Sequence, residues 1–114
     1  MKLYLAGPMR GYPEFNFPAF HAAAKLLREA GYEVFSPAEK GLEKHAEANP
    51  ESLAFRRAVF KLDTEWICDH ADGVALLPEW LKSKGAIAED ALARAVGLPS
   101  VSVETWLRDA ERLR

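Results

Sequence analysis

The sequence has little of what marks several broad classes of protein. A single cysteine, Cys68, excludes an internal disulfide; a free thiol is typical of a reducing compartment, so we expect a cytoplasmic location. No apolar run approaches the ~20 residues that a membrane-spanning helix needs, which argues against a membrane partner. The 15 basic residues are outnumbered by 17 acidic ones. This balance argues against a nucleic-acid polymer as partner, since such binding rests on excess lysine and arginine.

The composition that is present indicates a folded protein. Of the 114 residues, 49% are hydrophobic and 28% are charged, a balance that supports a buried core. The length is that of one domain, so we predict a single domain over residues 1–114. Three scattered histidines show no metal-ligand spacing, and no metal site is expected.

Short apolar runs alternate with helical patterns along the chain, as in a parallel α/β sheet. The predicted strands are Leu3–Ala6, Glu33–Phe35, Gly73–Leu77 and Ser100–Val103. The predicted helices are one that follows Pro18 and stops at Gly31, and those at about Leu53–Asp69, Ala86–Val96 and Glu104–Leu113. With right-handed crossovers, this order predicts a flavodoxin-like or Rossmann-like three-layer fold with a small, mostly parallel sheet of about four strands.

Helical spacing also predicts which side chains face the core. The predicted buried faces are Phe20, Ala23, Ala24 and Leu27; then Phe55, Val59, Leu62 and Trp66; then Ala88, Ala91, Leu92, Ala95 and Val96. One polar segment, Ala38–Ser52, has weak periodicity. A connection that long in a small domain is typical of a functional flap.

Three segments should meet beyond the carboxyl ends of the strands, where ligands bind in open parallel sheets. They are Gly7–Tyr12, Pro78–Gly85 and the end of the second strand with its polar loop. The loop Gly7–Gly11 contains Arg10, and a guanidinium with exposed amides suits an anion such as phosphate. A plain turn with a solvent-facing arginine is the alternative. The second segment enters the third helix, where Ser83 or Gly85 can stand at the N-cap. The free N–H groups of such a helix start form an anion site.

Two carboxylates are candidates for chemistry. Glu89 falls about one turn into the third helix, at the margin of the apolar stripe, where the helix dipole should favour the ionised form that a nucleophile needs. An ordinary first-turn glutamate is the alternative. Asp63 has four apolar neighbours one turn away, Val59, Phe60, Trp66 and Ile67. Partial desolvation should raise its pKa, as proton transfer requires, unless it lies at a solvated helix edge.

Four aromatic residues are candidates for stacking on a flat ring near the cleft. They are Tyr12, Phe15, Phe17 and Trp80. The competing interpretation is that they belong to the core.

Three motifs follow one another along the chain. They are Tyr4–Gly11, then Asp63–Ile67 leading to Ala71–Val74, then Ser83-x-Gly85-x-x-x-Glu89. In this order they resemble the motifs of the nucleoside 2-deoxyribosyltransferase superfamily, which includes the 2′-deoxynucleoside 5′-phosphate N-hydrolases. The resemblance extends from Met1 to about Val103.

The resemblance implies a role for each matching residue. Glu89 corresponds to the nucleophile, Asp63 to the second carboxylate, and Tyr4 to the active-site tyrosine. In the hydrolase branch, the 5′-phosphate would be held by Gly7, Met9, Arg10, Gly11, Ser83 and Gly85. Pro8 stands where the hydrolases tend to have a serine, which leaves a nucleoside as the alternative substrate. The resemblance also implies a homo-oligomer, although no residue after Val103 is identifiable as one that completes a neighbouring site.

Residues and resemblance together predict cleavage of the N-glycosidic bond of a 2′-deoxynucleoside or its 5′-monophosphate. Hydrolysis or transfer to another base would proceed through a covalent deoxyribosyl ester of Glu89. The partner is a small-molecule nucleoside or nucleotide, and no cofactor is expected, because both carboxylates belong to the protein. The alternatives are a nucleotide-binding or sensing module without turnover and an interaction domain without a ligand.

Overall fold

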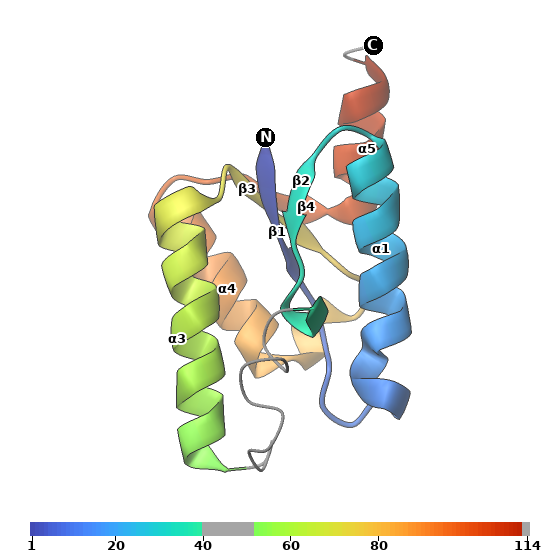
Figure 1. The fold of residues 1–114 in the computed structure, drawn as a ribbon. Coiled ribbons are helices and arrows are strands. Elements are labelled where there is room, and N and C mark those ends of the chain that lie inside the picture. Colours follow the sequence, from blue (N-terminus) through green and yellow to red (C-terminus); the bar gives the residue numbers. More distant parts are fainter. Residues whose placement is uncertain (40–51, 113–114) are drawn as a thin grey trace.

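Four parallel strands form the centre of the molecule, in the order β2-β1-β3-β4 (Figure 1). The computed structural model describes residues 1–39 and 52–112. The strands are β1 (Lys2–Ala6), β2 (Glu33–Phe35), β3 (Gly73–Leu76) and β4 (Ser100–Ser102). The predicted α/β fold is confirmed, and the third and fourth strands end one residue earlier than the sequence predicts.

Helices cover both faces of this sheet (Figure 1). They are α1 (Phe17–Glu29), α3 (Leu53–His70), α4 (Lys84–Ala95) and α5 (Val103–Arg112). Two short 3-10 turns, η1 (Pro13–Asn16) and η2 (Trp80–Lys82), precede α1 and α4. The helices α1 and α5 pack on one face, and α3 and α4 pack on the other.

The alternation of side chains along β1 divides the core into two halves. Leu3 and Leu5 point to the α1 and α5 side, while Tyr4 and Ala6 point to the α3 and α4 side. All four are buried. This alternation puts the tyrosine side chain on the face of the sheet that α3 and α4 cover.

The predicted helix faces have different outcomes. In α1 the predicted residues Phe20, Ala23, Ala24 and Leu27 are all buried. In α3 the predicted face is only half-buried, and the buried residues are Asp63 and Ile67.

The prediction of which side chains of α4 are buried is wrong. Its buried residues are Ala86, Glu89, Asp90 and Ala93, whereas the predicted stripe is partly or wholly exposed, with Val96 at 55% exposure. The helix is rich in alanine, whose small side chain carries little hydrophobic bias. Its orientation follows instead from two acidic residues that have partners in the core.

A tryptophan closes the opposite half of the core. The indole N–H of Trp106 donates a hydrogen bond of 2.9 Å to the carbonyl of Val74. Its own carbonyl accepts a bond of 2.8 Å from the hydroxyl of Tyr32. The indole occupies the space above Gly73, where a Cβ would come within 2.5 Å of Trp106 Cζ2. Only glycine therefore fits at the start of β3.

Two further expectations concern the whole chain. Within the ranges described, no helix has the length and apolarity to span a bilayer. Most of the predicted flap Ala38–Ser52 lies outside the described residues, which include only its first two and its last.

We expect Gly73→Ala to lower the free energy of unfolding by about 1–3 kcal/mol, because the added methyl group overpacks the contact with Trp106. Urea denaturation followed by circular dichroism measures the change. The matched control is Gly85→Ala in α4, where a Cβ meets only Ser83 Oγ at 3.8 Å. That change should be neutral or stabilising, because alanine is the better helix former. Equal losses in both variants would contradict the packing argument.

Candidate active site

Tyr4 links the sheet to α4. It lies in the middle of β1, between Phe35 of β2 and Val74 of β3. Its ring packs at 5.6 Å from the ring of Phe35 and 6.4 Å from that of Trp66. The hydroxyl donates a buried hydrogen bond of 2.6 Å to Oε2 of Glu89, 85 residues further along the chain. The rigid sheet thereby fixes the position of the glutamate.

Glu89 is almost fully buried, with 6% of its surface exposed. Burial and the nearby charge of Asp63 together raise the pKa of its carboxyl to about 8, against the hydrogen bond from Tyr4, which lowers it. Burial therefore opposes the ionised form that the sequence analysis expects the helix dipole to favour. Dipole stabilisation fades beyond the first turn, and Glu89 lies six residues after the N-cap Ser83.

Asp63 approaches from α3 and is 4% exposed. Its Oδ1 atom is buried and has no hydrogen-bond partner among the described residues. Burial raises its pKa to about 7, with a smaller opposing effect from the hydroxyl of Tyr4. The prediction that the apolar neighbours desolvate this residue is confirmed. Tyr4 interacts with both carboxyls, and burial with these two charges raises its pKa well above the usual value.

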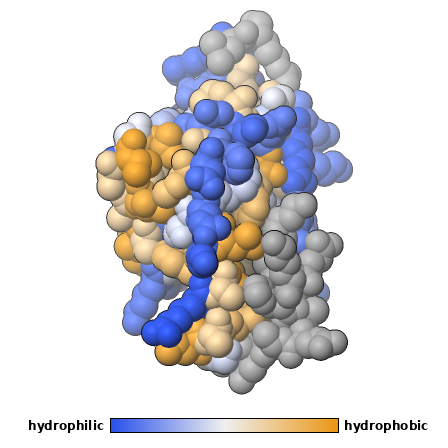
Figure 2. All heavy atoms as spheres, turned by 60° about the vertical axis from the view of Figure 1, so that its left-hand side comes forward, coloured by the Kyte–Doolittle hydropathy of each residue, from blue (hydrophilic) through white to orange (hydrophobic). Residues whose placement is uncertain are grey.

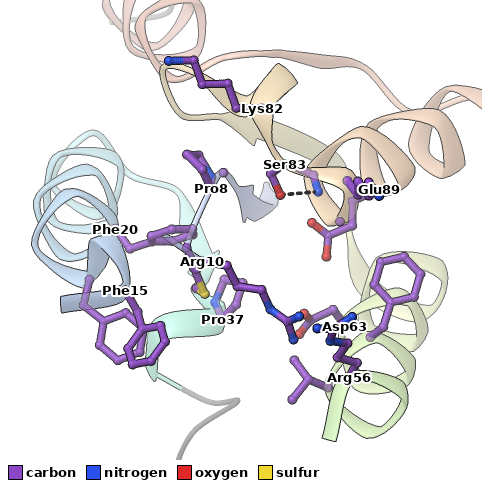
Figure 3. A pocket seen from close by; sticks show the side chains of 18 of the residues that line it. Pro8, Arg10, Phe15, Phe20, Pro37, Arg56, Asp63, Lys82, Ser83 and Glu89 are labelled. Atoms are coloured by element: carbon purple, nitrogen blue, oxygen red, sulfur yellow. Dashed lines mark hydrogen bonds between the residues drawn. The ribbon is translucent and has the colours of Figure 1, made fainter. Parts of the chain in front are cut away.

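The two carboxyls open into one cavity of about 530 Å³. Figure 3 shows Asp63 and Glu89 projecting into it from α3 and α4, with Phe15 and Phe20 on the α1 side. The predicted residues that line it are Tyr4, Gly7, Met9, Arg10, Asp63, Ser83, Gly85 and Glu89. Gly11 is not among the lining residues; its φ of +80° and open surroundings indicate a role in the turn.

Gly7 lets the loop after β1 pass closely over the end of β3. A Cβ at this position would lie 2.7 Å from Cβ of Leu77, which is too close for any other residue. The carbonyl of Ala6 accepts a bond of 2.8 Å from the amide of Leu77. The cavity wall formed by this loop is thus attached to two neighbouring strands.

Ser83 begins α4 as its N-cap. Its hydroxyl oxygen accepts a bond of 3.1 Å from the amide of Ala86, as the sequence predicts for this position. The hydroxyl proton is not used in that bond. The amides of Lys84 and Gly85 lie in the first turn, before the helical ladder begins, and both residues line the cavity. This helix start offers donors to an anion.

Several lining residues were not predicted as site residues. The cations Arg56, Lys82 and Lys84 line the cavity, as do the apolar residues Val59, Phe60, Phe55 and Pro37. Among the described residues of the lining, Arg10 brings the basic ones to four, against the two carboxyls. Charged residues at helix starts also occur on ordinary solvated faces, so the sequence alone offered no signal that distinguished these.

Of the four aromatic candidates, Phe15 and Phe17 line the cavity, whereas Tyr12 and Trp80 do not. The rings of Phe15 and Phe17 lie 6.1 Å apart. Trp80 packs instead against the core between the sheet and α4.

Phe15 reaches the cavity from a left-handed turn. Glu14, Phe15 and Asn16 have φ angles of 54°, 53° and 61°, a conformation that non-glycine residues rarely adopt. The side-chain amide of Asn16 donates a bond of 2.9 Å to the carbonyl of Pro8. The loop after β1 and the turn before α1 are therefore joined.

Comparison with known proteins identifies the family of the chain. Residues 1–102 match the family described as "Domain of unknown function (DUF4406)". A solved structure of the 2-deoxyribosyltransferase from Bacillus psychrosaccharolyticus is 30% identical, with a TM-score of 0.69 over 89% of this chain and 71% of that chain. The chain belongs to the nucleoside 2-deoxyribosyltransferase-like superfamily. No curated protein sequence matches the chain.

Membership confirms the resemblance on which the sequence motifs depend. The match to the family model covers the cavity, because residues 1–102 include every described residue that lines it. Within the described part of this superfamily member, no three histidine, cysteine or acidic residues are grouped as metal ligands.

The buried carboxyls predict how stability depends on pH. Between their usual pKa values of 3.8 and 4.5 and the raised values of about 7 and 8, the folded protein holds protons that the unfolded chain has released. Raising the pH from 5 to about 8.5 should therefore lower the free energy of unfolding. We expect Glu89→Gln to reduce this loss by more than about 1 kcal/mol, since one pKa unit corresponds to about 1.4 kcal/mol.

Urea denaturation at several pH values measures this effect, and Asp63→Asn should act in the same direction. Titrating groups outside the site contribute equally to wild type and variant, so the difference between them reports on the coupled carboxyl pair. An unchanged pH dependence in both variants would mean that neither group retains its proton in the folded state.

Proposed function

We propose that this protein cleaves the N-glycosidic bond of a 2′-deoxynucleoside or its 5′-monophosphate. The observation that carries the proposal is the 2.6 Å hydrogen bond from Tyr4 to Glu89, at the base of a cavity that also exposes Asp63. Membership of a superfamily whose compared structure is a 2-deoxyribosyltransferase supports this chemistry. Hydrolysis and transfer to a second base remain alternative second steps.

Glu89 acts as the nucleophile in this proposal. One carboxylate oxygen attacks C1′ of the sugar while the bond from C1′ to the base nitrogen breaks, which leaves a deoxyribosyl ester on Glu89. The hydrogen bond from Tyr4 stabilises the carboxylate and directs Oε2, so that Tyr4 orients the nucleophile. The absence of a 2′-hydroxyl eases formation of the sugar cation in the transition state.

Asp63 supplies the proton for the leaving base. Its raised pKa of about 7 leaves it about half protonated near neutral pH, which suits a group that gives and takes a proton. After the base leaves, the Asp63 carboxylate accepts a proton from the attacking water or from a second base. The oxygen of that water, or the nitrogen of the second base, forms a bond to C1′ while the bond from C1′ to Glu89 breaks, and both carboxyl groups return to their starting state.

The charge of the pair explains why the two roles can coexist. Burial favours retention of protons by both carboxyls, and their mutual repulsion disfavours two negative charges. In the reactive state of this proposal Asp63 holds the proton and Glu89 is ionised, and the hydrogen bond from Tyr4 favours the ionised form of Glu89. That state has one acid and one nucleophile, as a retaining mechanism requires.

The rim of the cavity favours an anionic substrate. Arg10, Lys82 and Lys84 line it together with the N-cap Ser83, and guanidinium groups and helix starts both bind phosphate. We therefore propose the 5′-monophosphate as the preferred substrate, with Gly7, Met9 and Gly85 shaping the same subsite. Gly11 would act only through the turn. A cytoplasmic location goes with this small-molecule chemistry and with the free thiol of Cys68.

A nucleotide-binding or sensing module is the second candidate function. The observation that favours it is the raised pKa of both carboxyls, because a protonated Glu89 can donate a hydrogen bond but cannot attack. Binding of a nucleotide to such a module would raise the melting temperature of the protein, and no free base would be released. Incubation with deoxynucleosides and their monophosphates, followed by chromatography and thermal shift, separates the two candidates.

We expect Glu89→Gln to reduce base release by at least about 1,000-fold, because the amide cannot form the ester intermediate. The matched control is Asp90→Asn on the same helix. The Asp90 carboxylate is buried but accepts bonds from Ser100 and Arg94, at 2.6 and 3.0 Å, and does not line the cavity. The control should lose stability and keep its turnover rate. Unchanged base release in Glu89→Gln would refute the mechanism.

We expect Arg10→Ala to raise KM for a deoxynucleoside monophosphate about 10- to 100-fold, the value of one charge-assisted hydrogen bond. KM for the corresponding nucleoside should change little. Arg108→Ala, an exposed arginine on α5 outside the cavity, is the control. If both substrates were affected equally, Arg10 would shape the cavity rather than bind the phosphate.

A further inference from the structure

One side of α3 forms a wall of the cavity. The residues of α3 that line the cavity are Phe55, Arg56, Val59, Phe60 and Asp63, whose spacing places them along one stripe of the helix. The proposed mechanism uses only Asp63. Arg56 is the one cation that α3 contributes to the described lining, and the proposed binding of the phosphate gives it no role.

A row of other charged residues follows the outer side of α3. Arg57, Lys61, Glu65 and Asp69 are exposed and do not line the cavity, and their spacing of four residues places them one above the other. Figure 2 shows this side of the molecule, where a hydrophilic strip runs between hydrophobic residues. Successive residues of a helix are turned by about 100°. The adjacent side chains of Arg56 and Arg57 therefore face different surroundings, the first the cavity and the second the solvent.

Arg56 and Asp63 lie on nearly the same side of α3, two turns apart. Seven residues advance about 10.5 Å along a helix and end within about 20° of two full turns. Between these two polar residues, Val59 and Phe60 line the cavity with apolar side chains. The wall formed by α3 is thus apolar in the middle, with an acid at one end and a cation at the other.

The wall opposite α3 is aromatic. Phe15, Phe17 and Phe20 line the cavity from the α1 side, and Figure 3 shows Phe15 and Phe20 across the cavity from α3. An aromatic wall facing an apolar one suits the two faces of a flat ring. The base of the proposed substrate fits between these walls, because it leaves a sugar held at Glu89 and takes its proton from α3.

A base in this position presents one edge to Asp63 and the opposite edge to Arg56. Two hydrogen bonds of about 2.9 Å each, with the width of the base between them, cover the spacing of the two residues. A guanidinium has N–H donors and no acceptor. It therefore pairs with a carbonyl oxygen on the far edge of the base, whereas an amino group there presents donors to donors.

We propose that Arg56 determines the base specificity of this site. It selects bases that carry an oxo group on the edge away from the sugar over bases that carry an amino group there. The selected class contains hypoxanthine and guanine among the purines and uracil and thymine among the pyrimidines. Adenine and cytosine are disfavoured. The inference rests on the proposed function, because that function brings a base to Asp63.

Two pairs of substrates that differ at this edge test the selection. They are the 5′-monophosphates of deoxyinosine and deoxyadenosine, and those of deoxyuridine and deoxycytidine. We expect kcat/KM for base release to be at least about 10-fold higher for the oxo member of each pair, the value of one charge-assisted hydrogen bond. Arg56→Ala should bring both ratios close to 1. Arg56→Glu, whose carboxylate only accepts hydrogen bonds, should favour the amino members.

The matched control is Arg57→Glu. It makes the same change in charge one residue further along α3, outside the cavity, and should keep the ratios of the wild type. Circular dichroism establishes that each variant is folded. A wild type that treats both members of each pair alike or prefers the amino members would overturn the proposal, as would a preference that survives in Arg56→Ala.

Binding measurements distinguish a failure of this inference from a failure of the proposed function. Isothermal titration calorimetry with Glu89→Gln, which cannot form the ester, gives Kd for the same four monophosphates without turnover. The oxo member of each pair should bind at least about 10-fold more tightly. This preference without base release by the wild type would refute the glycosidic cleavage and support the role of Arg56. Equal binding within each pair, or no binding of any of the four, would overturn the inference.

Discussion

Two carboxyl groups share one tyrosine hydroxyl in the interior of this protein, and the rest of the site is arranged around that constraint. An ionised carboxylate away from water is unfavourable unless it is paired or hydrogen-bonded. Among the described residues, Glu89 accepts a hydrogen bond from Tyr4, which is a neutral donor, and Oδ1 of Asp63 accepts no hydrogen bond. Proton retention is the consequence. The free-energy cost of burying the two charges raises the pKa of both carboxyls to values close to the pH at which acid and base chemistry operates.

The fold supports this arrangement by separating two tasks. One half of the core, with Leu5, Leu27 and Trp106, consists mainly of apolar contacts and includes the hydrogen bonds of the indole and Tyr32. The other half holds the acids and opens into the cavity. Because the sheet lies between them, the apolar packing of the first half does not depend on the acids of the second half. Strands of three to five residues are sufficient for this, since parallel pairing aligns their carboxyl ends at one edge.

The sequence predicted elements best where large apolar side chains carry the pattern. In α1, Phe20 and Leu27 mark the buried face without ambiguity. In α4 the side chains are mostly alanine, and the burial of Glu89 depends on a tyrosine 85 residues away, a contact that no local pattern contains. Asp63 was recognisable because its neighbours on the helix are all apolar. Arg56 and Lys84 were not, because a cation on a cavity rim has the same local sequence as one in bulk solvent.

The loop that carries Phe15 holds one wall of the cavity in a fixed conformation. Its three residues in the left-handed region and the bond from Asn16 to Pro8 restrict the wall before any ligand arrives. The conformational entropy of that wall is lost during folding, at the expense of overall stability. A ligand that enters has less freedom left to remove, so a small molecule with few contacts can still bind to it.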